Sequence, residues 1–406
     1  MNVGINPLLD TVLSTARRLF FRYWRPGVLV LSLALVTYLL YFRNLGTLLP
    51  GYAQPELDSY ITGSNWHNIA DNPVGAPYSV LVWICTAFAE HNLYSTRVVA
   101  AGFGVAAVLA FFAIVKHWYS FRIAFMGTLL FATSAGFLHN ARLGTAQILQ
   151  MSVLVLLAMA LWYKHSKRRN LVGYIVLGVA ALLWYIPGMI WFELLGAALV
   201  WRSIWGQLHR VPPIHLLAGF GLFLAILTPL VSAAVRNPDI ALSAAGLPNS
   251  LDALSQVPDN LWRSAAAIGI WGIGDPLTWL GRMPLLDVAE RILCAIGVYY
   301  YLYRRRPLRG IFLAIAVLIG LVLISFGGSV GFAVLIPLLY LFIVHGLDHL
   351  LSRWFVVFPR NPIARYVGVA VICIMLFFSV AYQTRSYFVA WPHNTNTRET
   401  FNLPSS

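Results

Sequence analysis

The carboxylates best placed for chemistry in this chain of 406 residues follow its first apolar stretch. Glu56 and Asp58 stand two positions apart there, within Ala53-Gln54-Pro55-Glu56-Leu57-Asp58. A carboxylate at such a place can accept a proton from an attacking hydroxyl group as a general base. Each also has a structural interpretation. Pro55 suits the first position of a helix, where an acid such as Glu56 complements the helix dipole, and Asp58 could equally be a solvated loop residue.

A second polar group closes a later apolar stretch, in His139-Asn140-Ala141-Arg142-Leu143-Gly144-Thr145-Ala146-Gln147. Arg142 could bind a phosphate group, or its long side chain could anchor a helix end at a membrane interface, and the sequence favours neither. Gln147 can donate and accept hydrogen bonds, but it cannot take a proton from a substrate.

Composition shows that these residues are held by a scaffold embedded in lipid. The chain is 59% hydrophobic and 10% charged, with a mean hydropathy of +0.74, whereas soluble domains carry about a quarter charged residues. Several apolar runs, such as 98–115 and 367–382, approach the roughly 20 residues that a helix needs to cross a bilayer. We therefore predict an all-α polytopic membrane protein.

The distribution of Lys and Arg predicts the orientation, because cytoplasmic loops retain these residues. If segment 78–90 crossed the membrane, the basic cluster at 164–169 would face outward, so we interpret 78–90 as a helix in the outer interface. The N-terminus is then cytoplasmic and the C-terminus outside. About 11 spans result, over 27–43, 97–115, 122–139, 146–163, 171–186, 187–201, 213–235, 286–303, 309–326, 329–347 and 364–383.

One membrane domain over 27–383 is predicted, between a basic amphipathic helix at 1–26 on the cytoplasmic surface and a short outer tail at 384–406. Two outer segments are long, 44–96 and 236–285. They contain too many Trp, Leu and Ile to be disordered, and long ordered loops are usually functional. We expect the active site in the first of them, with interfacial helices around it.

The succession of polar motifs resembles the GT-C glycosyltransferases, in the branch of protein O-mannosyltransferases and lipid A aminoarabinose transferases. The resemblance rests on Glu56 and Asp58 after the first span, the segment Asn72-Pro73-Val74-Gly75-Ala76-Pro77-Tyr78, Arg97 at the start of the second span, and Arg142 after the third. It covers about residues 25–165. By position, Glu56 takes the place of the family's catalytic acid, with Asp58 as its neighbour. Gln147 stands where the family often has a second acid.

This resemblance implies transfer of a sugar from a polyprenyl-phosphate donor to an acceptor protein, lipid or glycan, on the extracytoplasmic side and with inversion. A carboxylate would accept the proton of the acceptor hydroxyl, and cations would stabilise the departing lipid phosphate. The predicted donor- and substrate-binding residues are Arg142, Gln147, Tyr60, Tyr78, Arg263 and Arg282. No protein metal site is predicted, although a divalent ion could assist. The aromatic residues beside Arg263 and Arg282 could instead be interfacial anchors.

Other polar residues carry weaker signals. Glu193 lies within a predicted span, where an acid is a functional candidate by default, although hydration near the outer mouth would also explain it. The spacing of His345, Asp348 and His349 could bind a metal, but they end a span on the cytoplasmic side and we predict none there. The cysteines show no paired spacing and fit buried apolar positions, at Cys85, Cys294 and Cys373.

A multi-pass glycosyltransferase of a bacterial plasma membrane, with its active site outside, is therefore the leading functional prediction. Its partners would be the lipid-linked donor, the acceptor and membrane lipids. The net charge of +14 indicates a membrane surface rather than a nucleic acid. A lipid-linked glycan flippase or exporter is an alternative, although no internal repeat supports it. A non-catalytic protein of envelope assembly is a second alternative.

Overall fold

The computed structural model describes residues 24, 27–88, 93–165, 169–208, 212–250, 255–303 and 307–403. These residues form helices and no strand, with one isolated antiparallel bridge between Tyr52 and Leu403. The predicted all-α class is confirmed. Apart from Trp24, the predicted amphipathic helix at 1–26 lies outside the described residues, as do 166–168 and 304–306 of the predicted cytoplasmic loops.

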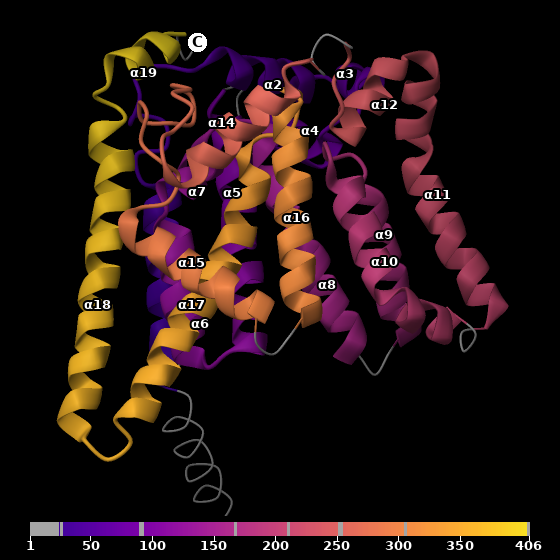
Figure 1. Cartoon of the computed structure of the whole chain (residues 1–406). Helices are drawn as coiled ribbons and strands as arrows, with labels where there is room; N and C mark the ends of the chain where they lie inside the picture. Colours follow the sequence, from indigo (N-terminus) through magenta and orange to yellow (C-terminus); the bar gives the residue numbers. More distant parts are fainter. Residues whose placement is uncertain are drawn as a thin grey trace, which may run out of the picture.

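A helix stands at each predicted span (Figure 1). Within the described ranges, five helical segments are long and apolar enough to cross a membrane, or six if one bent pair counts as a span. Shorter apolar helices, including Gly27–Phe42, accompany them. The elements at the predicted spans are α5 (Tyr94–Trp118), α6 (Phe121–Thr133), α7 (Ala135–Arg142), η1 (Ala146–Ser152), α8 (Val153–His165), α9 (Arg169–Leu183), α10 (Met189–Leu208), α11 (Pro213–Arg236), α15 (Val288–Tyr303), α16 (Pro307–Ser325), η2 (Phe332–Val334), α17 (Leu335–Val357) and α18 (Pro362–Arg385).

The predicted span over 122–139 is not one unbroken helix. Helix α6 ends at Thr133 and α7 begins at Ala135, with a bend of 61° between them. Ser134 between them has an extended backbone (φ −63°, ψ 137°), and its side chain accepts the amide N–H of Phe137 as an N-cap. Hydropathy does not reveal this break because α6 and α7 together are long and apolar enough to count as one span. The bend turns the end of α7, and with it Arg142, toward the first outer segment.

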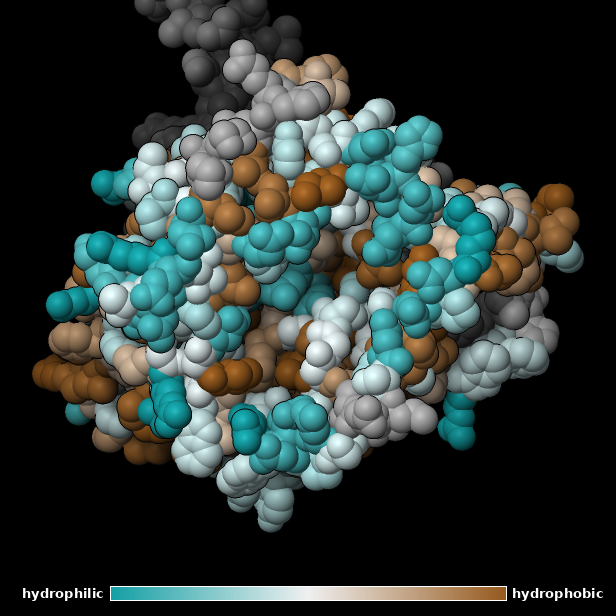
Figure 2. Space-filling view, turned by 90° about the horizontal axis from the view of Figure 1, so that it is seen from above, coloured by the Kyte–Doolittle hydropathy of each residue, from teal (hydrophilic) through white to brown (hydrophobic). Residues whose placement is uncertain are grey.

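The predicted outer segments are largely helical. The first contains α2 (Gln54–Ser64), α3 (Trp66–Asp71) and α4 (Ala76–Phe88), and the second contains α12 (Pro238–Ala245) and α14 (Val257–Gly269). Beyond α18, a π-helical turn, η3 (Ser386–Ala390), leads to α19 (Thr395–Thr400). Helices α2, α3, α12 and α19 gather at one end of the molecule, at the top of Figure 1. Seen from that end, polar side chains surround a hollow near the middle of the face (Figure 2).

Helix α17 lies in the interior of the main helix group. In its most apolar window 78% of residues are buried, against 22% for α18 at the edge. Its neighbours α5, α6 and α15 contribute to the same hydrophobic core, whereas α9, α11 and α12 share a second, smaller apolar cluster. The segment 44–96 packs on the N-terminal end of α5, and Glu56 within it is hydrogen-bonded to Gly144, just after α7. Helices α5 and α7 therefore position Arg97 and Arg142 beside this segment.

Candidate active site

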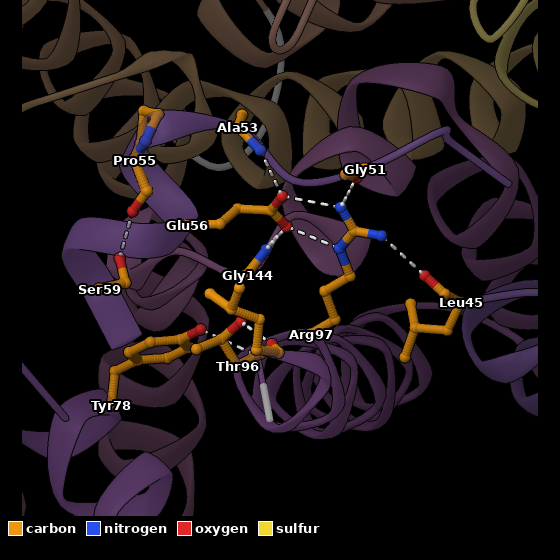
Figure 3. Close-up of polar contacts among 11 residues, drawn as sticks. Leu45, Gly51, Ala53, Pro55, Glu56, Ser59, Tyr78, Thr96, Arg97 and Gly144 are labelled. Carbon is orange, nitrogen blue, oxygen red and sulfur yellow. Dashed lines mark hydrogen bonds and ion pairs between the residues drawn. The ribbon is translucent and has the colours of Figure 1, made fainter. Parts of the chain in front are cut away.

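Glu56 is the carboxylate around which the first outer segment is organised. Helix α2 begins at Gln54 after the extended Ala53, which makes Glu56 its third residue. The Glu56 carboxylate reaches back to accept the backbone N–H of Ala53 at 3.1 Å (Figure 3). This contact satisfies a helix-start donor that has no partner within the helix. The structural interpretation of Glu56 as an acid at a helix N-terminus is therefore confirmed.

Arg97 forms a bidentate ion pair with Glu56. Its Nε lies 2.7 Å from Oε1 and its Nη2 lies 2.7 Å from Oε2, and both side chains are buried, with 2% and 0% exposed. The backbone N–H of Gly144 also donates to Oε1, at 2.8 Å. Each carboxylate oxygen thus accepts two hydrogen bonds. A buried charge pair of this kind is costly to break, because removing one member leaves the other uncompensated.

The ion pair joins four stretches of chain. Arg97 donates also to the carbonyl oxygens of Leu45 at 3.2 Å and Gly51 at 2.9 Å, which lie before α2 (Figure 3). Gly144 follows α7, and a Cβ there would collide with the Thr96 hydroxyl group. Only glycine lets this backbone approach the carboxylate so closely. The pair consequently holds the first outer segment, α5 and the end of α7 in one arrangement.

Arg142 is a second buried guanidinium, 4% exposed, at the end of α7. It donates to two carbonyl oxygens, of Leu40 and of Arg43, the latter at 2.7 Å. Its charge lies 5.7 Å from the Tyr387 ring centre and 5.1 Å from that of Phe388. The Nε of Arg142 has no hydrogen-bond partner, and within the described part of the chain no carboxylate lies within 4.0 Å of it. Arg142 is therefore a desolvated cation that forms no ion pair with any described carboxylate.

Glu56, Arg97 and Arg142 all line one cavity of about 10 Å³. It is close to the lower limit for one water molecule. Trp391 and Phe401 from the C-terminal segment are among its lining residues, and both are buried. This segment is fastened at both ends. The Trp391 indole donates to the Pro276 carbonyl at 3.0 Å, and Leu403 exchanges two backbone hydrogen bonds with Tyr52. The predicted outer tail thus covers the site.

Not every predicted site residue lies at this cavity. Asp58 is exposed on α2 and accepts a hydrogen bond from Gln54 at 2.9 Å. Tyr60 is half-buried on the same helix, and Gln147 is exposed on η1. Tyr78 is fully buried and donates to the Thr96 carbonyl at 2.8 Å. Burial raises the pKa of Tyr78 well above its usual value, so it stays protonated as this donor.

The predicted arginines of the second outer segment also lie elsewhere. Arg263 on α14 is exposed and pairs with Asp259 at 2.8 Å along the helix. Arg282 is exposed in the irregular stretch that follows α14. An exposed pair of this type contributes little to stability, so Arg263 is free to exchange partners. The structure therefore brings together Glu56 and Arg142 from the predicted set, and adds Arg97.

Two of the buried charged residues, Arg97 and Glu290, were not predicted as site residues. Arg97 could have been identified from the sequence, because it is a charged residue at the start of a long apolar run. Glu290, in the first turn of α15, is fully buried and accepts hydrogen bonds from Tyr340, from Gln383 at 2.7 Å and from the Asp287 amide at 3.0 Å. The spacing of Asp287 and Glu290 is that of a capping box, which could have identified this helix start.

The remaining sequence signals have local explanations. Glu193 on α10 accepts a hydrogen bond from the Trp184 indole at 2.8 Å. Cys85, Cys294 and Cys373 form no disulfide, but the prediction that they are buried is wrong, because Cys85 and Cys294 are half-buried and Cys373 is exposed on α18. In the ranges that the structure describes, no group of three or more His, Cys, Asp or Glu residues is arranged to hold a metal ion.

Comparison with known proteins places the fold. No protein-family model and no curated protein sequence matches the chain. Among solved structures it is similar to ArnT from Cupriavidus metallidurans in the apo state, with TM-score 0.56, 14% identity, and coverage of 93% of this chain and 78% of that one. The same ArnT bound to undecaprenyl phosphate gives TM-score 0.54, 14% identity, and coverage of 91% and 76%.

An oligosaccharyltransferase from Archaeoglobus fulgidus in the apo form is similar as well. The TM-score is 0.55 at 16% identity, and the match covers 92% of this chain and 56% of that one. ArnT, an aminoarabinose transferase, and the oligosaccharyltransferase are both GT-C glycosyltransferases. At such low identity the likeness establishes the fold alone. The predicted resemblance to the GT-C fold is confirmed.

Proposed function

We propose that this protein is a membrane glycosyltransferase that moves a sugar from a polyprenyl-phosphate donor to an acceptor hydroxyl group, on the extracytoplasmic side and with inversion. One observation carries the proposal. A buried arginine, Arg142, and a buried carboxylate, Glu56, line one small cavity, and among the described residues no carboxylate lies within 4.0 Å of Arg142. The GT-C fold supports it, because solved proteins of that fold are transferases and one of them has undecaprenyl phosphate bound.

Arg142 is the proposed phosphate-binding group. A guanidinium binds phosphate oxygens through charge-assisted hydrogen bonds, which are about twice as strong as neutral ones. The Nε of Arg142 has its donor still unused, and no described carboxylate competes for the charge. As the bond between the sugar and the phosphate breaks, the electron pair stays with the departing lipid phosphate. Arg142 would stabilise that negative charge in a site of low dielectric constant.

Glu56 is the proposed base. The acceptor oxygen attacks the anomeric carbon from the face opposite the phosphate, and the hydroxyl proton passes to the carboxylate. In the present arrangement both carboxylate oxygens already accept two hydrogen bonds each. The carboxylate can therefore take a proton only after at least one of these donors withdraws. Asp58, which is exposed two residues away, is the alternative base.

Access to the site requires movement of the C-terminal segment. A cavity of about 10 Å³ holds neither a sugar nor a phosphate group, and Trp391 and Phe401 close it. Because the segment is attached through Leu403 to Tyr52, its displacement would also free the loop whose carbonyl groups bind Arg97. Opening the cavity and loosening the donors around Glu56 would then be one event.

Transfer of a radiolabelled sugar from defined polyprenyl-phosphate donors by the purified protein tests this proposal. We expect Arg142→Gln to weaken donor binding by about 10- to 100-fold, the value of a lost charged hydrogen bond. Arg236→Gln is a matched control, because Arg236 is 62% exposed and its nearest acid, Asp71, lies 3.8 Å away. The proposal fails if Arg142→Gln binds donor as tightly as the control. If no donor supports transfer, one of the non-catalytic alternatives gains support.

A further inference from the structure

A second and much larger cavity, of about 500 Å³, lies at the other end of α5 from the candidate active site. Trp118 and Tyr119 line it from the end of α5, and Tyr300 and Tyr301 line it from α15. Arg97 and Trp118 are separated by about 20 residues of helix, or about 30 Å. The two cavities are therefore separate. The volume lies within the range of small-molecule sites, about 300 to 1,000 Å³.

The remaining wall is a polar stripe on α17. Five polar residues at helical spacing i, i+3, i+4, i+7 and i+8 face the cavity, namely His345, Asp348, His349, Ser352 and Arg353. The rest of this helix is apolar. All five side chains of this stripe line the cavity, at the predicted end of the span, where a polar face is tolerated along a water-filled cavity. The stripe therefore belongs to the cavity rather than to helix packing.

Glycines fix the distance between the two helical walls. A Cβ on Gly297 of α15 would collide with the Phe342 carbonyl, and one on Gly346 of α17 would collide with the Leu293 carbonyl. The two helices therefore meet backbone to backbone. Gly346 follows His345 in the sequence, so the close contact between α15 and α17 lies at the N-terminal end of the polar stripe.

Aromatic rings hold the imidazoles of the stripe in place. The ring centre of Tyr300 lies 3.4 Å from that of His349, and the ring centre of Tyr301 lies 3.8 Å from that of His345. The Tyr119 hydroxyl contacts the Tyr301 hydroxyl at 2.6 Å and Nδ1 of His345 at 3.1 Å. These contacts order the wall without a ligand, which lowers the entropic cost of binding one.

The charges around the cavity favour an anion. Arg353 lines the cavity, and the guanidinium of Arg309 lies over the ring of the lining residue Trp118, 4.9 Å from the ring centre. The lining contains one carboxylate, that of Asp348. With neutral imidazoles the local balance is therefore positive, and protonation of either histidine would increase it. The Ser352 hydroxyl adds a further hydrogen-bond donor.

We propose that this cavity binds a phosphate ester. The Arg353 guanidinium would hold two phosphate oxygens, because its planar fork matches their geometry. Ser352 and the imidazoles would bind the other oxygens of the ester, and the aromatic rings would pack on the apolar part of the ligand. The ester has two sources, the headgroup of a membrane phospholipid or a soluble metabolite. The cavity lies at a span end, where basic pockets between helices bind lipid headgroups. This inference does not depend on the transfer reaction.

Two probes with the same headgroup distinguish the sources. Native mass spectrometry of the purified full chain in detergent would measure binding of short-chain phosphatidylglycerol and of glycerol 3-phosphate. We expect Arg353→Gln to weaken binding of the preferred probe by about 10- to 100-fold, and Arg353→Lys by less. Arg360→Gln is the control, because Arg360 is exposed just beyond α17 and does not line the cavity. Arg353 is itself exposed, so its replacement leaves the core intact.

Binding of the lipid alone, lost in Arg353→Gln, would identify a headgroup site. Equal binding of glycerol 3-phosphate, lost in the same variant, would identify a site for a soluble phosphate ester. Both results support a phosphate site at this cavity. The inference is overturned if neither probe binds, or if Arg353→Gln and Arg360→Gln reduce binding equally.

Discussion

Replacement of Glu56 by Gln is expected to destabilise the protein strongly, because it breaks the buried ion pair with Arg97. The carboxylate accepts four hydrogen bonds, two of them from Arg97, and is completely buried. A Gln amide offers one accepting oxygen, so its NH₂ group would face donors that remain in place. Arg97 would keep its charge without a counter-charge. Removal of one member of a buried pair costs about 3–5 kcal/mol, a large part of a typical folding free energy of about 5–15 kcal/mol.

Thermal unfolding in detergent, followed by size-exclusion chromatography of the heated sample, would measure this loss. We expect the midpoint temperature to fall on the order of 10 °C for Glu56→Gln. Asp58→Asn is the matched control, because Asp58 is exposed and makes one side-chain contact, with Gln54. Exposed substitutions of this kind change stability by about 0.5 kcal/mol or less. Equal midpoints for the two variants would refute the importance that we attach to the ion pair.

A double variant separates the structural role of Glu56 from its proposed chemistry. Glu56→Gln with Arg97→Gln removes both charges together, so part of the lost stability should return, with a coupling energy of about 0.5–3 kcal/mol. The rate of sugar transfer should stay reduced, because loss of a general base typically costs about 10²–10⁴ in rate. If activity returned together with stability, Glu56 would be a positioning residue, and Asp58 would become the candidate base.

Other predictions follow from separate parts of the structure. The double variant Tyr52→Cys with Leu403→Cys should form a disulfide, because residues of a hydrogen-bonded antiparallel pair have Cα atoms about 5.5 Å apart. Sugar transfer by this variant should stop until a reductant is added, whereas the single variant Leu403→Cys should stay active. Gly144→Ala should lower the unfolding midpoint, because its Cβ would collide with Thr96; an unchanged midpoint would contradict the close approach. Gly346→Ala should cost about 1–3 kcal/mol through overpacking and weaken phosphate-ester binding, measured by unfolding and native mass spectrometry. Cysteine labelling of intact cells should modify Asn68→Cys from outside and Arg360→Cys only after permeabilisation; the opposite pattern would reverse the proposed orientation.

Much of the scaffold could be read from the sequence, because its determinants are local. A bilayer imposes an apolar run on each span, so hydropathy located the helices at the predicted spans, although it missed the bend at Ser134. The position of Glu56 after Pro55 predicted an acid in the first turn of a helix, and α2 starts there. The resemblance to GT-C glycosyltransferases, drawn from short motifs, was also correct at the level of the fold.

Only the tertiary structure decided which groups meet. The Glu56 carboxylate accepts hydrogen bonds from Arg97 and Gly144, which lie far along the chain. No helical or strand periodicity in the sequence predicts such a long-range pairing. The bend between α6 and α7, which hydropathy does not record, is likewise a feature of the tertiary structure, and among the described residues no carboxylate lies within 4.0 Å of Arg142. The C-terminal segment was predicted as a simple tail, since its composition says nothing of a bridge between Leu403 and Tyr52. Burial and charge pairing depend on three-dimensional neighbours, whereas sequence patterns report on neighbours along one helix.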